Sequence, residues 1–295
     1  MNLNIPSPIT KLNSIFLKKK SVEIYVKRDD LIHEIISGNK SRKLKYNFMD
    51  AQTKDYTNIL SYGGPYSNHL HALSYMSKKL NLKSIGVVRG QKYDKLNPTL
   101  SFCQINNMSF YYLNREDYRH KKYDPLNLQL FRKKYGEFYL IPEGGNNLLG
   151  LNGCSEILSE VDVNFDFFCC AVGTSCTASG IIRALKKNQF LIGFCPFLKI
   201  LEQENNIKKW TKSDNWKLVP DLFFKGFGQI DQELTLFVKK FYWNYNIKLD
   251  LIYMGKLFYH LFNYIQRDFF KKNTKILVLH SGGLQGLHGF NFDFK

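Results

Sequence analysis

The chain has 295 residues, a formal net charge of +17 and a hydrophobic content of 44%. This length allows one large or two modest domains with a substantial core, and the composition excludes a disordered chain. No stretch approaches the ~20 apolar residues of a membrane span, and the first residues lack the apolar run of a signal peptide. We therefore expect neither a membrane protein nor a secreted one.

The cysteines and the basic residues narrow the class further. No CxxC pair and no zinc-type Cys/His spacing occurs, so we expect a reduced, cytoplasmic protein without a structural metal. The basic residues are dispersed, and lysine outnumbers arginine in a chain rich in Asn, Ile, Tyr and Phe, as an AT-rich genome would produce. We expect no specific nucleic-acid binding, and anionic small substrates or cofactors as the partners of this charge.

Strand-like and helix-like segments alternate along the chain. Residues 22–30 alternate like a strand, and 41–52 carry Leu44, Phe48 and Ala51 at helical spacing. Further strands are predicted at 58–64, 84–90, 110–115, 138–145, 165–174, 191–197, 221–226, 249–255 and 275–283. Helices are predicted at 67–80, at 178–187 and after each of the strands at 191–197, 221–226 and 249–255. This order predicts an α/β protein with parallel sheets covered by helices.

Glycines recur just after the predicted strands, at 63–64, 144–145, 173 and 282–283. Ligands of such sheets bind beyond the carboxyl ends of the strands. Glycines also serve simply as tight turns, but four such turns at one edge favour a shared ligand pocket.

Three ordered motifs carry a family resemblance: "KRDDL…SGNKSRKL", "SYGGPYSNHLHA" and "HSGGLQGLHGF". Together they resemble the pyridoxal-phosphate (PLP) enzymes of the D-cysteine desulfhydrase and 1-aminocyclopropane-1-carboxylate (ACC) deaminase family. The resemblance implies the tryptophan-synthase-β-like fold, with two open, twisted parallel-sheet domains and the cofactor in the cleft between them. We expect a larger PLP-binding domain of residues 1–46 plus 147–295 and a smaller α/β domain of residues 47–146.

The resemblance places the lysine that binds the cofactor aldehyde at Lys40 of "GNK". Ser37 is the predicted helix N-cap, which puts Lys40 in the first helical turn. The helix dipole disfavours an ammonium there, and burial can depress a lysine pKa by up to about 3–5 units. A neutral amine is the nucleophile that an aldehyde requires. We expect Arg42, Lys43 and Lys45 to be solvated or paired.

The segment "GGPYSNH" resembles the family's loop over the cofactor ring. The resemblance implies that Ser67 lies near the substrate and that Asn68 donates to the phenolate oxygen of the ring. Ser67 could instead cap the following helix, and the two roles can coexist.

The segment "VGTSCTASG" resembles the phosphate cup, because backbone N–H groups at a helix start bind phosphate. Its predicted cofactor-binding residues are Gly173, Thr174, Ser175, Cys176 and Thr177. The family pattern usually carries more glycine here.

The segment "LDLIYMGK" resembles the stretch that supplies a catalytic tyrosine, here Tyr253. Where ACC deaminases have a glutamate that pairs with the pyridine nitrogen, this chain has Met254. The hydroxyl of Ser281 in "LHSGG" is the predicted replacement. A neutral partner makes the ring a weaker electron sink, which favours β-elimination over opening of a cyclopropane ring.

Other positions depart from the family pattern. Tyr66 replaces a usual Gln, His71 stands where an Arg is common, and Phe227 replaces a second active-site tyrosine. His69 and His71 could also be residues of the helix surface.

The sequence thus predicts a PLP-dependent lyase, a homodimer, that converts a small amino acid such as D-cysteine to pyruvate and ammonia. The alternatives are ACC deaminase, a PLP-binding protein with little catalysis, and a basic nucleic-acid binder with a borrowed fold.

Overall fold

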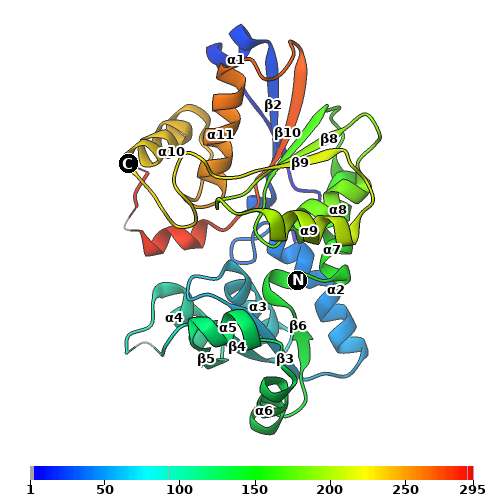
Figure 1. The fold of residues 1–295 in the computed structure, drawn as a ribbon, viewed down its shortest axis with the longest axis vertical. Coiled ribbons are helices and arrows are strands. Elements are labelled where there is room, and N and C mark those ends of the chain that lie inside the picture. The colour runs from blue at the N-terminus through cyan, green and yellow to red at the C-terminus, as the bar shows by residue number, and fades with distance from the viewer. Residues whose placement is uncertain (1–2, 93, 291, 295) are drawn as a thin grey trace.

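The computed structural model describes residues 3–92, 94–290 and 292–294, and contains two parallel sheets (Figure 1). The described strands are β1 (Ile9–Leu12), β2 (Val22–Lys27), β3 (Asn58–Gly63), β4 (Lys83–Arg89), β5 (Met108–Leu113), β6 (Tyr139–Ile141), β7 (Phe167–Ala171), β8 (Phe190–Phe194), β9 (Trp216–Val219) and β10 (Thr274–Leu279). The α-helices are α1 (Ile15–Lys20), α2 (Asn39–Thr53), α3 (Asn68–Lys79), α4 (Pro98–Ile105), α5 (Arg115–Lys121), α6 (Pro125–Tyr135), α7 (Leu148–Ser155), α8 (Cys176–Ala184), α9 (Leu201–Trp210), α10 (Gln232–Tyr245) and α11 (Met254–Gln266).

The larger sheet has the strand order β1-β2-β10-β7-β8-β9, and the smaller has the order β5-β4-β3-β6. All neighbours pair in parallel except the edge strand β1, which is antiparallel to β2. The predicted α/β class with parallel sheets is therefore confirmed. The predicted boundary after residue 46 falls inside α2, a single helix that continues to Thr53, and the domain limits stay a prediction.

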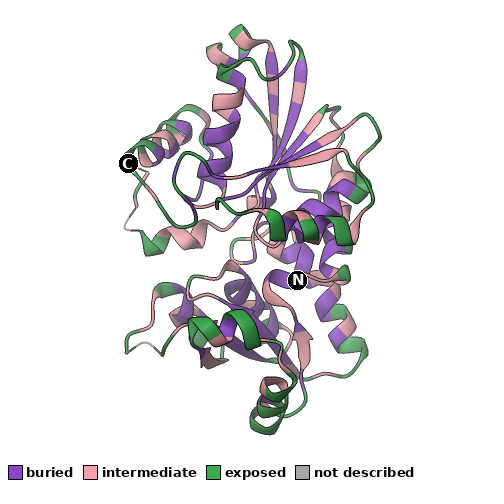
Figure 2. Ribbon diagram, viewed as in Figure 1, coloured by how far each residue is buried: buried purple, intermediate pink, exposed green. Residues whose placement is uncertain are grey.

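Alternation of side chains along the strands builds a core on each face of both sheets. In β7, Cys169 packs with one cluster, whereas Phe168 and Cys170 pack with the cluster on the opposite face. In β3, Ile59 and Leu60 divide in the same way between two clusters of the smaller sheet. Figure 2 shows the buried residues concentrated in the strands and in the helix faces that cover them. Among the described helices, none combines the length and the apolar character needed to span a bilayer.

Two predicted strands are wrong, and in each case a buried aspartate explains why. The Asp250 carboxylate accepts hydrogen bonds from the backbone N–H groups of Ile252, Tyr253 and Met254 at 2.7–3.0 Å, so residues 251–253 form a turn that leads into α11. Asp221 likewise accepts from the N–H of Phe224 at 3.1 Å, and residues 221–226 form a loop. Aspartate side chains that bond to nearby backbone groups compete with strand pairing. The short strands β1 and β9, which lie at the edges of the larger sheet, were not predicted.

A buried ionic network fixes the start of α2 to the larger sheet. Arg42 donates through Nε to Asp29 Oδ2 at 2.9 Å and through Nη2 to Glu160 Oε2 at 2.9 Å. Lys27, fully buried on β2, donates to Glu160 at 2.7 Å. Burial opposes ionisation of Glu160, but the bonds from Arg42 and Lys27 outweigh it and lower the pKa of Glu160 to about 2.

Arg42 and Lys43 are both buried rather than solvated. Arg42 is paired, which was the other expectation, with Asp29 and Glu160. Lys45 is half-exposed and pairs with Glu156 at 2.9 Å, as expected.

The buried network leads to a stability prediction. Arg42→Ala removes the guanidinium that binds both Asp29 and Glu160 and leaves Lys27 as their remaining cation, so we expect it to lower the free energy of unfolding by about 3–5 kcal/mol. Lys45→Ala, in the same helix, removes an exposed pair and should change that free energy by less than about 1 kcal/mol. Urea titrations followed by far-UV circular dichroism measure both, and equal losses would contradict the assigned role of the network.

Candidate active site

The first turn of α2 is held between two loops of the larger sheet. Gly38, not Ser37 as predicted, is the N-cap residue, and no side chain caps this helix. Its backbone N–H donates to Asp29 O at 2.7 Å, and the next N–H, of Asn39, donates to Ser281 O at 3.3 Å. A Cβ on Gly38 would lie 1.8 Å from Ser281 O, and φ is +71°, so only glycine fits this position.

Lys40 lies in that first turn, as predicted, with its amine held by side chains. Nζ donates to Asn39 Oδ1 at 2.6 Å, and Asn39 Nδ2 donates to Thr177 Oγ1 at 2.8 Å. Burial, reinforced by the charge of Lys43, lowers the pKa of Lys40 to about 7. A large neutral fraction at neutral pH makes this amine a competent nucleophile.

The loop before α8 is the predicted phosphate cup, and its side chains have different partners. Ser175 has φ +69° and its hydroxyl donates to Gln203 O at 3.0 Å, so its side chain is already engaged. The Cys176 thiol lies 3.4 Å from Gly145 O, and Thr177 accepts from Asn39. These side chains already have protein partners, so the backbone N–H groups at the start of α8 are the groups that best suit a phosphate.

Lys43 is a site residue that the sequence analysis missed. Its ammonium is buried, lies 3.4 Å from Thr174 Oγ1 and has no carboxylate partner among the described residues. An unpaired buried cation is costly, so the site fits an anion such as the cofactor phosphate. The available signal was spacing, because residues three apart share a helix face and Lys43 follows Lys40 by three.

The loop after β3 meets the loop after β10. Ser67 is the N-cap of α3, and its Oγ accepts from the Leu70 N–H at 3.2 Å, which confirms the capping alternative. The Asn68 Oδ1 accepts from Gln285 Nε2, and a Cβ on Gly283 would lie 2.7 Å from Asn68 Nδ2. Two of the predicted glycine turns thus meet although they follow strands of different sheets, and Asn68 and Ser67 lie half-buried where they meet.

Three further residues that the sequence analysis singled out are in contact with the larger sheet's loops: Tyr253, Met254 and Ser281. A Cβ on Gly173 would lie 3.5 Å from the Tyr253 hydroxyl, and burial raises the pKa of Tyr253. Met254 is buried, and its sulfur lies 3.5 Å from the Ser281 hydroxyl. The Phe227 ring packs edge-on against Tyr253, with ring centroids 6.0 Å apart. Met254 occupies the position of the family's glutamate, and Ser281 is the predicted replacement partner of the ring nitrogen. The two residues are therefore direct neighbours.

The two histidines are not helix-surface residues. His69 is buried with Nε2 2.8 Å from Ser61 Oγ, and its Nδ1 has no hydrogen-bond partner among the described atoms. Burial, together with the charges of Lys40 and Lys43, lowers the pKa of His69 to about 3. His71 stacks on Phe102 at 3.9 Å between centroids, and burial lowers its pKa to about 4. Both rings are therefore neutral at physiological pH.

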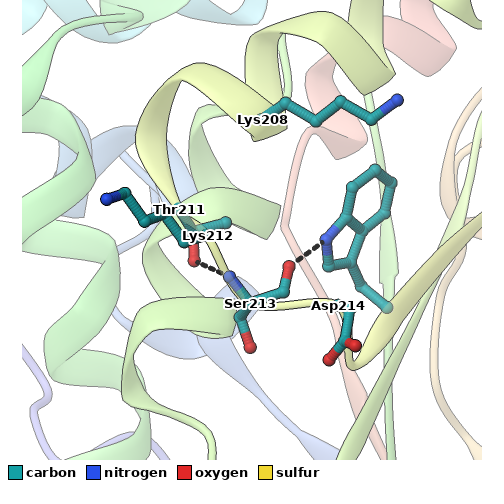
Figure 3. A pocket seen from close by; sticks show the side chains of 6 residues that line it. Lys208, Thr211, Lys212, Ser213 and Asp214 are labelled. Carbon is teal, nitrogen blue, oxygen red and sulfur yellow. Dashed lines mark hydrogen bonds between the residues drawn. The ribbon is translucent and has the colours of Figure 1, made fainter.

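A separate hollow on the surface does not belong to the site around Lys40. Figure 3 shows it between the end of α9 and the start of β9, where Ser213 N donates to Thr211 Oγ1 and Trp216 Nε1 donates to Ser213 O. It lies at the amino end of β9, whereas the cluster around Lys40 lies beyond the carboxyl ends of its strands. The described residues hold no group of His, Cys, Asp and Glu side chains arranged for a metal ion. All six cysteines are free and buried.

Comparisons with known proteins agree with this geometry. The chain is 28% identical to a putative ACC deaminase of Pyrococcus horikoshii over 95% of this chain and 90% of that protein. It is 29% identical to the mitochondrial bifunctional D-cysteine desulfhydrase/ACC deaminase of Arabidopsis thaliana, over 97% and 78%. It is 26% identical to a D-cysteine desulfhydrase of Klebsiella pneumoniae, over 91% and 89%.

Solved structures share the fold. A crystal structure of an ACC deaminase homologue matches with a TM-score of 0.84 and 26% identity, over 97% of this chain and 92% of that one. The O-acetylserine dependent cystathionine β-synthase of Helicobacter pylori matches with a TM-score of 0.66 at 17% identity, over 93% and 91%, which shows the fold alone. The predicted family resemblance and fold are confirmed. The model of pyridoxal-phosphate dependent enzymes matches residues 1–199, well over half of the chain, and the protein therefore belongs to that enzyme family.

Proposed function

We propose that this PLP-dependent enzyme catalyses β-elimination from a small β-substituted amino acid, most simply D-cysteine, giving pyruvate and ammonia. The observation that carries the choice of branch is the buried contact of Met254 with Ser281. A thioether cannot keep a proton on the pyridine nitrogen, whereas a serine hydroxyl can form only a neutral hydrogen bond with it. The Asp250 carboxylate, four residues earlier, is occupied by three backbone N–H groups.

The roles of the residues follow from their positions. Bound PLP supplies an electrophilic aldehyde and an electron sink. Lys40 Nζ would hold that aldehyde and is the base that would take the proton from the substrate α-carbon, with Asn39 orienting the amine. Lys43, Gly173, Thr174 and the backbone from Ser175 to Thr177 hold the phosphate.

Four further side chains act on the ring and the substrate. Asn68 donates to the phenolate oxygen of the cofactor, and Ser67 faces the substrate. The Tyr253 hydroxyl, whose pKa burial raises, stays protonated and serves as a donor at the reacting face. The Ser281 hydroxyl is the partner of the ring nitrogen.

ACC deaminase is the second candidate, and several relatives carry that name, as others carry that of D-cysteine desulfhydrase. A turnover panel of D-cysteine, L-cysteine, β-chloro-D-alanine, D-serine and ACC decides between the two. Faster turnover of ACC than of D-cysteine would overturn the proposed β-elimination, and no turnover at all would favour a PLP-binding protein with little catalysis. Four expectations stay predictions. Light scattering tests the homodimer, cell fractionation the cytoplasmic location, and limited proteolysis the domain limits. A DNA titration at several salt concentrations tests the absence of specific nucleic-acid binding.

The depressed pKa of Lys40 predicts how the apoprotein reacts with PLP. Only the neutral amine attacks an aldehyde, and its pKa is about 7 rather than the ordinary 10.5. The reaction rate should therefore rise as pH increases through about 7 and level off above it. Stopped-flow absorbance measures this rate, and Lys40→Ala should give no borohydride-trapped adduct. A rate that still climbs steeply between pH 9 and 10 would contradict the assignment.

Removal of the Lys43 charge should weaken cofactor binding. Lys43→Met keeps the length of the side chain but loses a charge-assisted hydrogen bond to the phosphate, worth about 1.5–3 kcal/mol, so we expect Kd for PLP to rise by about 10- to 150-fold. Fluorescence titration of the apoprotein measures it. Lys45→Met, two residues further along the same helix, is the control and should leave Kd unchanged. Equal affinities for all three proteins would remove Lys43 from the site.

The contact between Met254 and Ser281 leads to a prediction about the partner of the ring nitrogen. Ser281→Ala loses a neutral hydrogen bond and should weaken PLP binding by about 0.5–1.5 kcal/mol, with a parallel loss of turnover. Met254→Glu should protonate the ring nitrogen, which a shift of the cofactor absorbance reports, without creating ACC turnover, because Phe227 and His71 also differ from that branch. An unchanged spectrum in Met254→Glu would place this side chain away from the ring nitrogen.

A further inference from the structure

Arg89 is an unpaired guanidinium at the carboxyl end of β4. Its side chain is exposed, and it forms no ion pair with any described residue. Its only packing partner of note is the ring of Tyr118, whose centroid lies 5.8 Å from the guanidinium carbon. In a parallel sheet the carboxyl ends of neighbouring strands meet at one edge, so Arg89 shares an edge with the loop that follows β3.

The guanidinium lies against the loop that carries Ser67. A Cβ on Gly64 would lie 3.3 Å from Arg89 Nη2, so a side chain at Gly64 would crowd the guanidinium. Gly64 in turn accepts the backbone N–H of Ser67 at 3.1 Å, which closes the turn at the start of α3. Arg89 therefore lies next to the positive end of α3 and to the proposed substrate-facing hydroxyl.

The charge of Arg89 also acts on Tyr253, the N-cap residue of α11. Burial raises the pKa of Tyr253, with further contributions from Asp250 and Glu143, and the positive charge of Arg89 opposes this rise. Arg89 therefore lies in the space beside the Ser67 loop and within electrostatic reach of the predicted catalytic tyrosine.

Other cations near this space are already engaged or uncharged. Lys43 faces Thr174, and Lys122 pairs with Glu143 at 2.5 Å. His69 and His71 are neutral because their pKa values are about 3 and 4. Arg89 is thus the cation available to a substrate anion on this side of the site.

We propose that Arg89 binds a carboxylate of the amino-acid substrate, in a subsite completed by the start of α3 and the Ser67 loop. A guanidinium matches a carboxylate with two parallel hydrogen bonds and so fixes the orientation of the substrate as well as binding it. This inference rests on the proposed function. The carboxylate is either the α-carboxylate, common to all amino acids, or an acidic side chain, and the two sources give different results in the test.

The test follows the cofactor absorbance of the holoenzyme during titration with three ligands. The first is the enantiomer of alanine that wild type binds, the second is its amide, and the third is aspartate of the same handedness. Arg89→Gln should weaken alanine binding by about 10- to 100-fold and leave the amide unaffected if Arg89 holds the α-carboxylate. If it holds an acidic side chain, only aspartate binding weakens. Arg89→Lys should recover part of the loss, because it restores the charge without the two-pronged geometry.

Arg183→Gln is the matched control, since Arg183 is exposed in the last turn of α8, at the end away from the phosphate cup. If both glutamine variants unfold at the same temperature as wild type, their fold is intact. The proposal is overturned if Arg89→Gln binds all three ligands as wild type does, or if wild type binds neither enantiomer of alanine. Failure of the proposed β-elimination is seen separately, as absent turnover of the substrate panel by an enzyme whose titrations still respond.

Discussion

The position of the active-site lysine depends on the buried ionic network of Arg42, Asp29, Glu160 and Lys27. Arg42 lies two residues after Lys40 on α2, and its bonds to Asp29 and Glu160 hold that turn to the carboxyl end of β2 and to the segment after α7. Asp29 adds a backbone bond, because its carbonyl accepts the N–H of Gly38. Each charge of this network is matched, so moving α2 away from the larger sheet would leave at least one of them buried without its present partner.

A single helix thereby connects the chemistry of both sheets. The first turn of α2 touches the loop after β10 and, through Asn39, the start of α8, whereas its later residues Leu44, Phe48 and Ala51 belong to the core of the smaller sheet. Elements of both sheets meet at the site, where a Cβ on Gly145 would lie 3.1 Å from Lys43 Cβ and 3.7 Å from His69 Cε1.

The site concentrates positive charge in a place where little of it is neutralised. Lys40 and Lys43 lie on one face of the first turns of α2, and the charge of Lys43 helps to lower the pKa of Lys40. Such an arrangement is electrostatically unfavourable without an anion, and it favours an amine that is neutral over one that is charged. Affinity for a phosphate and reactivity of the lysine thus have one physical origin.

Local patterns in the sequence determined the fold class, the helix that carries Lys40 and the glycine turns after the strands, because strand alternation, helical spacing and turn glycines are properties of short segments. That these turns are divided between two sheets was decided by the tertiary structure. The local patterns also located Ser67 as a cap and Met254 beside the last-strand loop, through motifs that recur in order. Tertiary structure alone decided that Arg42 and Lys43 are buried rather than solvated, that His69 and His71 are neutral, and that residues 221–226 and 251–253 are a loop and a turn rather than strands. Each of these depends on partners far along the chain, such as Glu160 for Arg42, or on a buried aspartate whose carboxylate binds nearby backbone N–H groups. Burial and pairing are set by the whole fold, and a short window of sequence contains neither.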